Sequence, residues 1–146
     1  MKKQITLYSD GSSLGNPGPG GYGGILEYRG KRKEYSGAEP YTTNNRMELR
    51  AVIEGLKLLK DPCMVEVVSD SSYVVKAINE WLPNWIRKEF KKVKNPDLWK
   101  EYLEVASPHD IKGKWVRGHN GHPENERCDT LAREEAEKIK GSSNTK

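Results

Sequence analysis

Three strand patterns precede the first helix pattern in this chain, and this order limits the folds that it can adopt. Residues 4–9 alternate between apolar and polar side chains, and 22–28 and 32–38 follow as two further strand patterns. Arg29-Gly30-Lys31 joins the last two, which predicts an antiparallel hairpin. The glycine- and proline-rich residues 11–24 are expected to form a turn.

Helix patterns then alternate with two more strands. An apolar stripe at helical spacing predicts a helix over 44–59, which Pro62 ends. The valines of 65–68 scarcely alternate with polar residues, which indicates a strand buried on both faces. Three further helices are expected: one over 72–81, one that begins at Pro96 with Asn95 as its cap, and one from Pro123 to near Gly141. A further strand is expected over 111–116.

A strand hairpin followed by strand–helix–strand units predicts an α/β fold, a mixed sheet flanked by helices. The 146 residues suit one domain, with 1–140 as the folded unit and 141–146 as a disordered tail. Cys63 and Cys128 are too few for a disulfide scaffold and are expected to be buried free thiols. No signal-peptide core and no run of ~20 apolar residues is present, so we expect a soluble, cytoplasmic protein.

The charge of the chain favours a polyanionic partner. Its formal net charge is +4, with a pI of about 9.0. Basic and aromatic residues interleave within 81–94, which suits a phosphate track with sugar or base contacts. The alternative is a solvated basic helix with the tryptophans in the core. The residues concerned are Trp81, Trp85, Arg87, Lys88, Phe90, Lys91, Lys92 and Lys94.

A Ser-Asp pair stands at the end of two predicted strands, at Ser9-Asp10 and at Ser69-Asp70. If these strands are parallel neighbours, both aspartates emerge at the same edge of the sheet, where ligands of open α/β sheets bind. Two carboxylates there repel each other unless a cation lies between them, and Mg²⁺ prefers such oxygen ligands. Either aspartate alone could instead form an Asx-turn or cap the next segment, but the matched pair favours a metal site.

The other candidate ligands have structural alternatives. Glu48 lies three residues after Asn45, which is the spacing of a capping box. Asp129 lies on the last predicted helix, where a solvated helix face is the simpler interpretation. A weaker alternative is a zinc site built from His119, His122 and Cys128. No fourth ligand for zinc is evident.

Longer motifs follow one another along the chain. They are Ser9–Ser12 running into Gly15–Gly23, Thr42–Leu49, Ser69–Ser71, Asn95–Trp99, and Gly118-His119 with Gly121–Asp129. A lone Asp-Gly-Ser would carry little weight, but this set in this order resembles the bacterial type 1 ribonucleases H. The resemblance covers essentially the whole chain up to the tail.

The resemblance implies the ribonuclease H fold, a five-stranded mixed sheet flanked by helices, with the first and fourth strands adjacent. It implies an endoribonuclease that hydrolyses the RNA strand of RNA–DNA hybrids and leaves 5′-phosphate and 3′-hydroxyl ends. The expected cofactor is Mg²⁺, with Mn²⁺ as a substitute and two ions in the catalytic complex. The expected partner is the hybrid duplex, with no membrane, no obligate protein partner and a monomeric state.

The resemblance also assigns residues to roles. The metal-binding active site would be Asp10, Glu48, Asp70 and Asp129, with His119 as a mobile histidine that assists proton transfer or product release. Contacts to the RNA strand would come from Gly11, Ser13, Asn16, Asn44 and Asn45. Thr43 and Asn95 would grip a DNA phosphate, and a basic protrusion with Trp81, Trp85, Lys88, Lys91 and Lys92 would hold the DNA strand.

The chain departs from the family pattern at several positions. Ser13 stands where some members have cysteine, and Ser72 where many have a glutamine that contacts RNA. Tyr41 replaces an arginine of some relatives, which puts the strength of the DNA-phosphate pocket in doubt, and the protrusion is a few residues shorter. Two other classes fit less well: a non-catalytic hybrid-binding module would lack one or more carboxylates, and an integrase or transposase core usually needs further domains.

Overall fold

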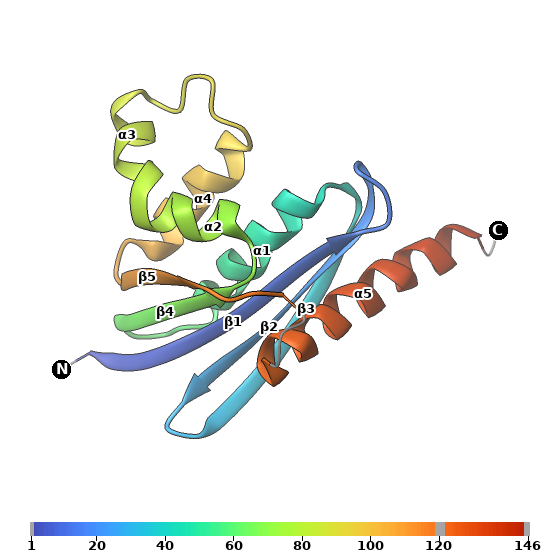
Figure 1. Ribbon diagram of the computed structural model, residues 1–146, viewed down its shortest axis with the longest axis horizontal. Helices are drawn as coiled ribbons and strands as arrows, with labels where there is room; N and C mark the ends of the chain where they lie inside the picture. Colours follow the sequence, from blue (N-terminus) through green and yellow to red (C-terminus); the bar gives the residue numbers. More distant parts are fainter. Residues whose placement is uncertain (1, 119–121, 145–146) are drawn as a thin grey trace.

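A five-stranded mixed sheet runs through the centre of the computed structural model, which describes residues 2–118 and 122–144 (Figure 1). The sheet order is β3-β2-β1-β4-β5; β1, β2 and β3 pair antiparallel, whereas β4 is parallel to both β1 and β5. This confirms the predicted mixed sheet and the adjacency of its first and fourth strands. The strands are β1 (Lys3–Ser13), β2 (Gly18–Tyr28), β3 (Lys31–Thr42), β4 (Cys63–Ser69) and β5 (Asp110–Trp115).

Helices cover both faces of the sheet. The residues of β2 show this directly, because a side chain added at Gly20 would meet Met47 of α1, whereas one added at Gly21 would meet Ala132 of α5. Successive residues of a strand point to opposite faces, so α1 and α5 lie on opposite sides, as Figure 1 shows. The helical elements are α1 (Asn44–Lys57), α2 (Ser72–Lys76), the π-helical turn η1 (Ala77–Trp81), α3 (Leu82–Arg87), α4 (Pro96–Ala106) and α5 (Pro123–Asn144).

The main hydrophobic core lies between the sheet and α1. Leu7 of β1 and Val67 of β4 are fully buried there against Leu49 and Ile53 of α1. Trp99 of α4 closes this core and is also fully buried. The apolar stripe predicted for residues 44–59 is therefore the face that holds α1 on the sheet.

The prediction of a turn over residues 11–24 was wrong, because β1 extends to Ser13 and β2 begins at Gly18. The glycines of this segment serve close packing within a strand. A side chain at Gly23 would lie 2.7 Å from the carbonyl oxygen of Cys128 in α5, and one at Gly24 would overlap the ring of Tyr35. Glycine in a strand often marks such an approach of another backbone or ring.

Two helical segments also differ from the sequence-based expectation. The sequence pattern predicted no element between the helix over 72–81 and the helix from Pro96, but α3 occupies Leu82–Arg87. Pro83 falls in its first turn, where proline is tolerated. Trp81, which one of the two interpretations placed in the core, is 37% exposed. The last helix continues past Gly141 to Asn144, since Gly141 does not take up the positive φ with which glycine ends a helix. Disorder of 141–146 stays a prediction, and residues 145–146 lie outside the described part.

Across residues 2–118 and 122–144, none of the helices has the length and apolar character that a membrane span requires.

Replacing Gly21 by alanine tests the close packing of α5 on β2. The new methyl group would overlap the carbonyl oxygen of Ala132, so we expect the free energy of unfolding to fall by about 1–3 kcal/mol. The matched control is Gly141→Ala, whose added carbon meets nothing within 4 Å and which should be neutral or slightly stabilising. Urea denaturation followed by circular dichroism measures both; equal effects would contradict the packing described.

Candidate active site

Three acidic side chains from different parts of the chain meet at one edge of the sheet. Asp10 lies in β1, Asp70 follows β4 directly, and Glu48 lies near the start of α1. The parallel register pairs Tyr8 with Val68, so the same register carried forward brings Asp10 beside Asp70. One carboxylate oxygen from each of the three residues lies within 4.8 Å of the others, which is close enough for them to share one metal ion.

Glycine at position 11 brings Glu48 to the two aspartates. A side chain at Gly11 would overlap the main-chain nitrogen of Glu48 and the carbonyl carbon of Met47. The backbones of β1 and α1 therefore touch at the residue that follows Asp10. The Gly11 N–H also donates to Oδ1 of Asp10 at 2.9 Å, which holds that carboxyl group in place.

The capping-box interpretation of Glu48 was wrong. The N-cap of α1 is Thr43, whose hydroxyl accepts from the N–H of Arg46 at 3.3 Å, so Asn45 and Glu48 both lie inside the helix. Oε2 of Glu48 is buried and has no hydrogen-bond partner among the described residues. A buried oxygen without a partner is costly, and a hard divalent cation would satisfy it, so these residues fit such an ion.

Burial and mutual repulsion raise the pKa values of two of these carboxyl groups. Burial, followed by the charge of Asp70, raises the pKa of Asp10 to about 7. Burial and the neighbouring charge of Asp10 raise the pKa of Glu48 well above its usual range. A divalent cation between them would offset the repulsion and favour the ionised forms, with release of protons.

Asp129, the fourth predicted ligand, lies on α5 beside the other three. It lines a small cavity together with Asp10 and Asp70, and its charge contributes to the raised pKa of Asp10. Its Oδ2 accepts from Nε of Arg133 at 2.9 Å, one helical turn further along α5. Asp129 is therefore near the three clustered carboxylates but does not belong to the group that could share one ion.

His119 lies outside the described residues, so its predicted role stays a prediction. The same holds for the alternative zinc site, which needs His119 together with His122 and Cys128. Within residues 2–118 and 122–144, the group of potential metal ligands found is the three-carboxylate cluster. Cys128 is fully buried, and burial raises the pKa of its thiol, which disfavours the thiolate that zinc requires.

Ser13, Asn16 and Asn44 join the β1–β2 turn to the start of α1. Oδ1 of Asn44 accepts from the Ser13 N–H at 2.7 Å, and Oδ1 of Asn16 accepts from the Asn44 N–H at 3.2 Å. These bonds orient both amides so that each Nδ2 is left without a partner among the described residues. Asn45 follows on the exposed side of α1. This surface therefore offers N–H donors close to the carboxylates.

Arg46 connects Thr43 and Asn95, the predicted phosphate-binding pair, because its backbone N–H donates to the Thr43 hydroxyl and its side chain donates to Asn95. The Arg46 guanidinium donates to Oδ1 of Asn95 at 3.2 Å and to both carboxylate oxygens of Asp97, at 3.1 and 2.8 Å. Asn95 precedes α4 with a φ of 58°, and its side chain does not cap that helix as predicted; its Nδ2 donates to the Tyr73 hydroxyl at 3.2 Å. The sequence did not point to Arg46 or Tyr73, because these contacts join distant segments.

The basic segment after α2 keeps its lysines in solvent. Trp81 is partly exposed, and Trp85 packs between it and the buried Trp99, with ring centroids 5.6 and 5.5 Å apart. Both interpretations of the two tryptophans therefore hold in part, since Trp85 belongs to the edge of the core and supports the exposed Trp81. The exposed lysines include Lys88, Lys91 and Lys92.

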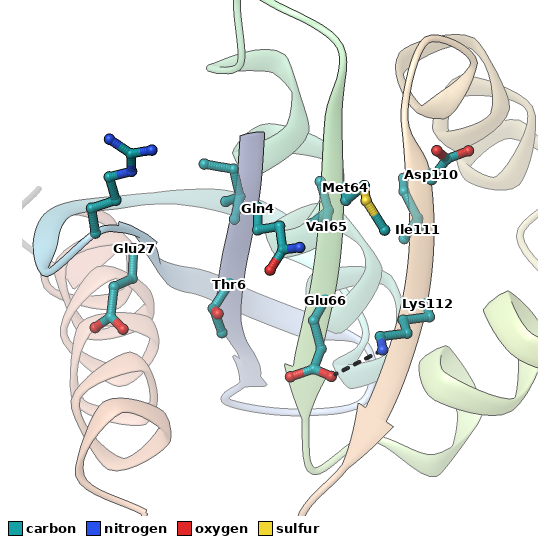
Figure 2. Close-up of a pocket in the computed structure, with 11 residues that line it drawn as sticks. Gln4, Thr6, Glu27, Met64, Val65, Glu66, Asp110, Ile111 and Lys112 are labelled. Atoms are coloured by element: carbon teal, nitrogen blue, oxygen red, sulfur yellow. Dashed lines mark ion pairs between the residues drawn. The ribbon is translucent and has the colours of Figure 1, made fainter. Parts of the chain in front are cut away.

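A second cavity, of about 430 Å³, lies across the other end of the strands (Figure 2). Thr6 and Glu66 line it, and Nζ of Lys112 lies 3.8 Å from Oε2 of Glu66. None of the three clustered carboxylates lines this cavity. Acidic and basic side chains both line this cavity, and we interpret it as a solvent-filled hollow on the sheet.

Comparison with known proteins decides the family, since the family model for RNase H matches residues 2–137. The chain belongs to the ribonuclease H family. It is 80% identical over 141 residues to a ribonuclease H of Sulfurovum sp. (strain NBC37-1), which covers 97% of this chain and 96% of that one.

Two solved structures of ribonucleases H are similar to this one. LC9-RNase H1, described as a type 1 RNase H with the type 2 active-site motif, has a TM-score of 0.87 at 34% identity, over 95% of this chain and 74% of that one. LC11-RNase H1 in complex with RNA/DNA hybrid has a TM-score of 0.67 at 27% identity, over 92% and 97%. The chain is a bacterial type 1 ribonuclease H, an endonuclease that hydrolyses the RNA strand of RNA–DNA hybrids by metal-ion catalysis.

Replacing Asp10 by asparagine should stabilise the metal-free ribonuclease H at pH 8. The folded-state pKa of about 7 lies above the ordinary 3.8, so ionisation of Asp10 opposes folding. This penalty begins above the unfolded-state pKa and is complete above pH 7. At about 1.4 kcal/mol per pKa unit, the difference between 3.8 and about 7 corresponds to at most about 4 kcal/mol. We expect a gain of about 2–4 kcal/mol at pH 8, which vanishes near pH 3 where the carboxyl is protonated in both states.

Urea denaturation in the presence of a chelator, at pH values between 3 and 8, measures this gain. A variant that is no more stable than the native chain at pH 8, or equally stabilised at every pH, would show that burial and the neighbouring charges do not raise the pKa of Asp10 in the folded chain. Asp97→Asn is the matched control, because its partner Arg46 lowers the pKa of Asp97, so this substitution should destabilise the protein at pH 8.

Proposed function

We propose that this ribonuclease H holds two divalent ions, Mg²⁺ or Mn²⁺, at Asp10, Glu48, Asp70 and Asp129. The observation that carries the proposal is the buried, unpartnered Oε2 of Glu48 within the cluster that it forms with Asp10 and Asp70. Such a buried carboxylate oxygen needs a partner, and a cation that the two aspartates share is the partner that suits it.

The protein side chains divide the work in this proposal. Asp10, Glu48 and Asp70 are assigned to one ion, and Asp129, which lines the cavity beside Asp10, is assigned to the other. When bound, the two ions supply an activated water and neutralise charge on the scissile phosphate and on the 3′ leaving oxygen. His119 is assigned to proton transfer or product release, as the family pattern implies. The products then carry 5′-phosphate and 3′-hydroxyl ends.

Recognition of the RNA strand is assigned to the surface beside the carboxylates. The 2′-hydroxyl distinguishes RNA from DNA, and it accepts hydrogen bonds. Nδ2 of Asn16 and of Asn44 are suitable donors, because the Oδ1 atoms of both amides already accept from backbone N–H groups, those of Asn44 and Ser13 respectively. Ser13 and Asn45 extend this surface. Gly11 has a packing role against Glu48, and its contact with RNA stays a prediction.

Recognition of the DNA strand is assigned to two further groups. Thr43 and Asn95 form the phosphate contact, and the Arg46 guanidinium donates to Oδ1 of Asn95. Tyr41, which is 75% exposed, supplies no charge at the position where some relatives have an arginine. On the protrusion, the exposed ring of Trp81 suits sugar or base contacts, and the ring of Trp85 packs against it. Three exposed lysines there, Lys88, Lys91 and Lys92, suit phosphates.

The same proposal covers the cellular location, the oligomeric state and the partners of the enzyme. The substrate is a polyanionic duplex, and the chain carries its own metal ligands and basic surface. We therefore propose that it acts in the cytoplasm as a monomer, without an obligate protein partner or a membrane.

Cleavage of a labelled RNA–DNA hybrid tests the site assignment. With Mg²⁺ or Mn²⁺ the native chain should cut the RNA strand and leave double-stranded RNA and DNA intact. Asp10→Asn and Asp70→Asn should each lower the rate at least about 100-fold, because each removes a charged metal ligand, and His119→Ala should slow turnover without abolishing it. Unchanged cleavage by Asp10→Asn, or cleavage in a chelator, would refute the assignment.

Removing the three lysines of the protrusion tests its contact with the DNA strand. The triple variant Lys88→Ala, Lys91→Ala and Lys92→Ala should weaken hybrid binding at low salt and reduce the slope of log Kd against log salt by about 2 to 3. Fluorescence anisotropy with a labelled hybrid measures both quantities. The matched control replaces three exposed lysines on the β2–β3 hairpin and on α5, Lys31, Lys33 and Lys140, and should keep more of the slope; equal losses would mean that binding reflects overall charge.

A further inference from the structure

Trp115, at the end of β5, makes a directed contact with the site that none of the roles above includes. Its side chain is 51% exposed, and its indole Nε1 donates to the main-chain carbonyl oxygen of Asp70 at 3.0 Å. A half-exposed ring gains only part of the free energy of apolar burial, which any large apolar side chain would supply as well. The hydrogen bond is the property that tryptophan adds at this position.

The bond completes a series on three consecutive carbonyl groups at the end of β4. The carbonyl of Val68 accepts from Nδ2 of Asn125 at 3.0 Å, and the carbonyl of Ser69 accepts from the Val116 N–H at 3.0 Å. The pairing of β4 with β5 ends where Ser69 faces Trp115, so the Asp70 carbonyl lies beyond the ladder. The Trp115 side chain supplies the donor that the backbone no longer offers there.

The turn that carries Asp70 is held from other directions too. The Ser71 N–H donates to the Ser69 hydroxyl at 3.0 Å, and the Ser71 hydroxyl caps α2 by accepting from the Val74 N–H at 3.2 Å. On the far side, a side chain at Gly118 would lie 2.6 Å from Oδ2 of Asp70. The chain that leaves β5 thus contacts Asp70 twice, at its carbonyl through Trp115 and at its carboxylate through Gly118.

We propose that Trp115 is a positioning residue, whose indole N–H fixes the peptide group after Asp70 and so directs the Asp70 carboxylate toward Asp10 and Glu48. The inference rests on the proposed metal site. Metal ligands must be held to within about 0.5 Å of their working positions, and partners behind the ligands often change metal affinity 10- to 100-fold. Trp115 acts through Asp70 and needs no contact with the substrate.

Two substitutions at this position separate the hydrogen bond from the bulk of the ring. Trp115→Phe removes the N–H and keeps an aromatic ring, and replacement of the indole by benzothiophene, through an expanded genetic code, removes only the N–H. The matched control is Asn79→Ala, since the Asn79 side chain bonds both the N–H and the carbonyl of Gly113, elsewhere on β5, at 2.8 and 2.9 Å. That control weakens the attachment of β5 and leaves the Asp70 contact in place.

Mg²⁺ affinity without substrate is the decisive readout. Isothermal titration and the rise in Tm with Mg²⁺ should both give a Kd about 10-fold weaker in the two Trp115 variants and unchanged in Asn79→Ala. The Mg²⁺ concentration for half-maximal hybrid cleavage should shift in parallel, with little change in KM for the hybrid at saturating Mg²⁺.

The outcomes separate this inference from the proposed function. Native Mg²⁺ affinity in the benzothiophene variant would overturn the role of the N–H, even if the native enzyme needs Mg²⁺. An equal loss of affinity in Asn79→Ala would reduce Trp115 to general support of β5 and would also overturn it. If the native chain itself neither bound Mg²⁺ nor needed a divalent ion for cleavage, the proposed metal site would be refuted, and the positioning role of Trp115, which rests on that site, would be refuted with it.

Discussion

The parallel pairing of β1 with β4 is the constraint on which the rest of the site depends. Its register places Tyr8 opposite Val68, and therefore brings Asp10 and Asp70 out at the same edge of the sheet. A shift of one residue would send one of the two carboxylates to the other face. Packing of the buried strands in the core maintains this register. Glu48 on α1 and Asp129 on α5 then lie at the edge of the sheet where Asp10 and Asp70 emerge.

The same arrangement works against folding at the site itself. Buried carboxyl groups beside one another raise each other's pKa, and Glu48 keeps a buried oxygen without a partner among the described residues. Close packing elsewhere compensates, because glycines at 21 and 23 let α5 lie directly on β2, and Gly11 lets α1 touch β1. Stability is supplied by the layers, and the local conflict is confined to the place where a cation would bind.

Local pattern predicted those parts of the chain whose structure depends on local interactions. The alternation of residues 4–9, the stripe of 44–59 and the matching Ser-Asp pairs gave the sheet, the long helix and the approach of Asp10 to Asp70. The role of Glu48 was ambiguous because its spacing from Asn45 also fits a capping box. That interpretation requires Asn45 to be the N-cap of the helix, but the N-cap is Thr43. The glycines of 18–24 were mistaken for a turn because the helix and ring that pack on them are distant in sequence. Arg46, Tyr73 and Trp115 were missed for the same reason.

The central claim is that this fold gathers its carboxylates to hold divalent cations, and the most direct test is to locate those cations. Crystals grown with Mn²⁺ and a hybrid, using Asp10→Asn to prevent turnover if the native enzyme cuts too fast, allow an anomalous difference map at the manganese edge. The account predicts one peak contacted by Glu48 and Asp70 and a second beside Asp129. Strong Mn²⁺ peaks elsewhere on the protein, with none at these carboxylates in either the native or the variant crystals, would contradict it.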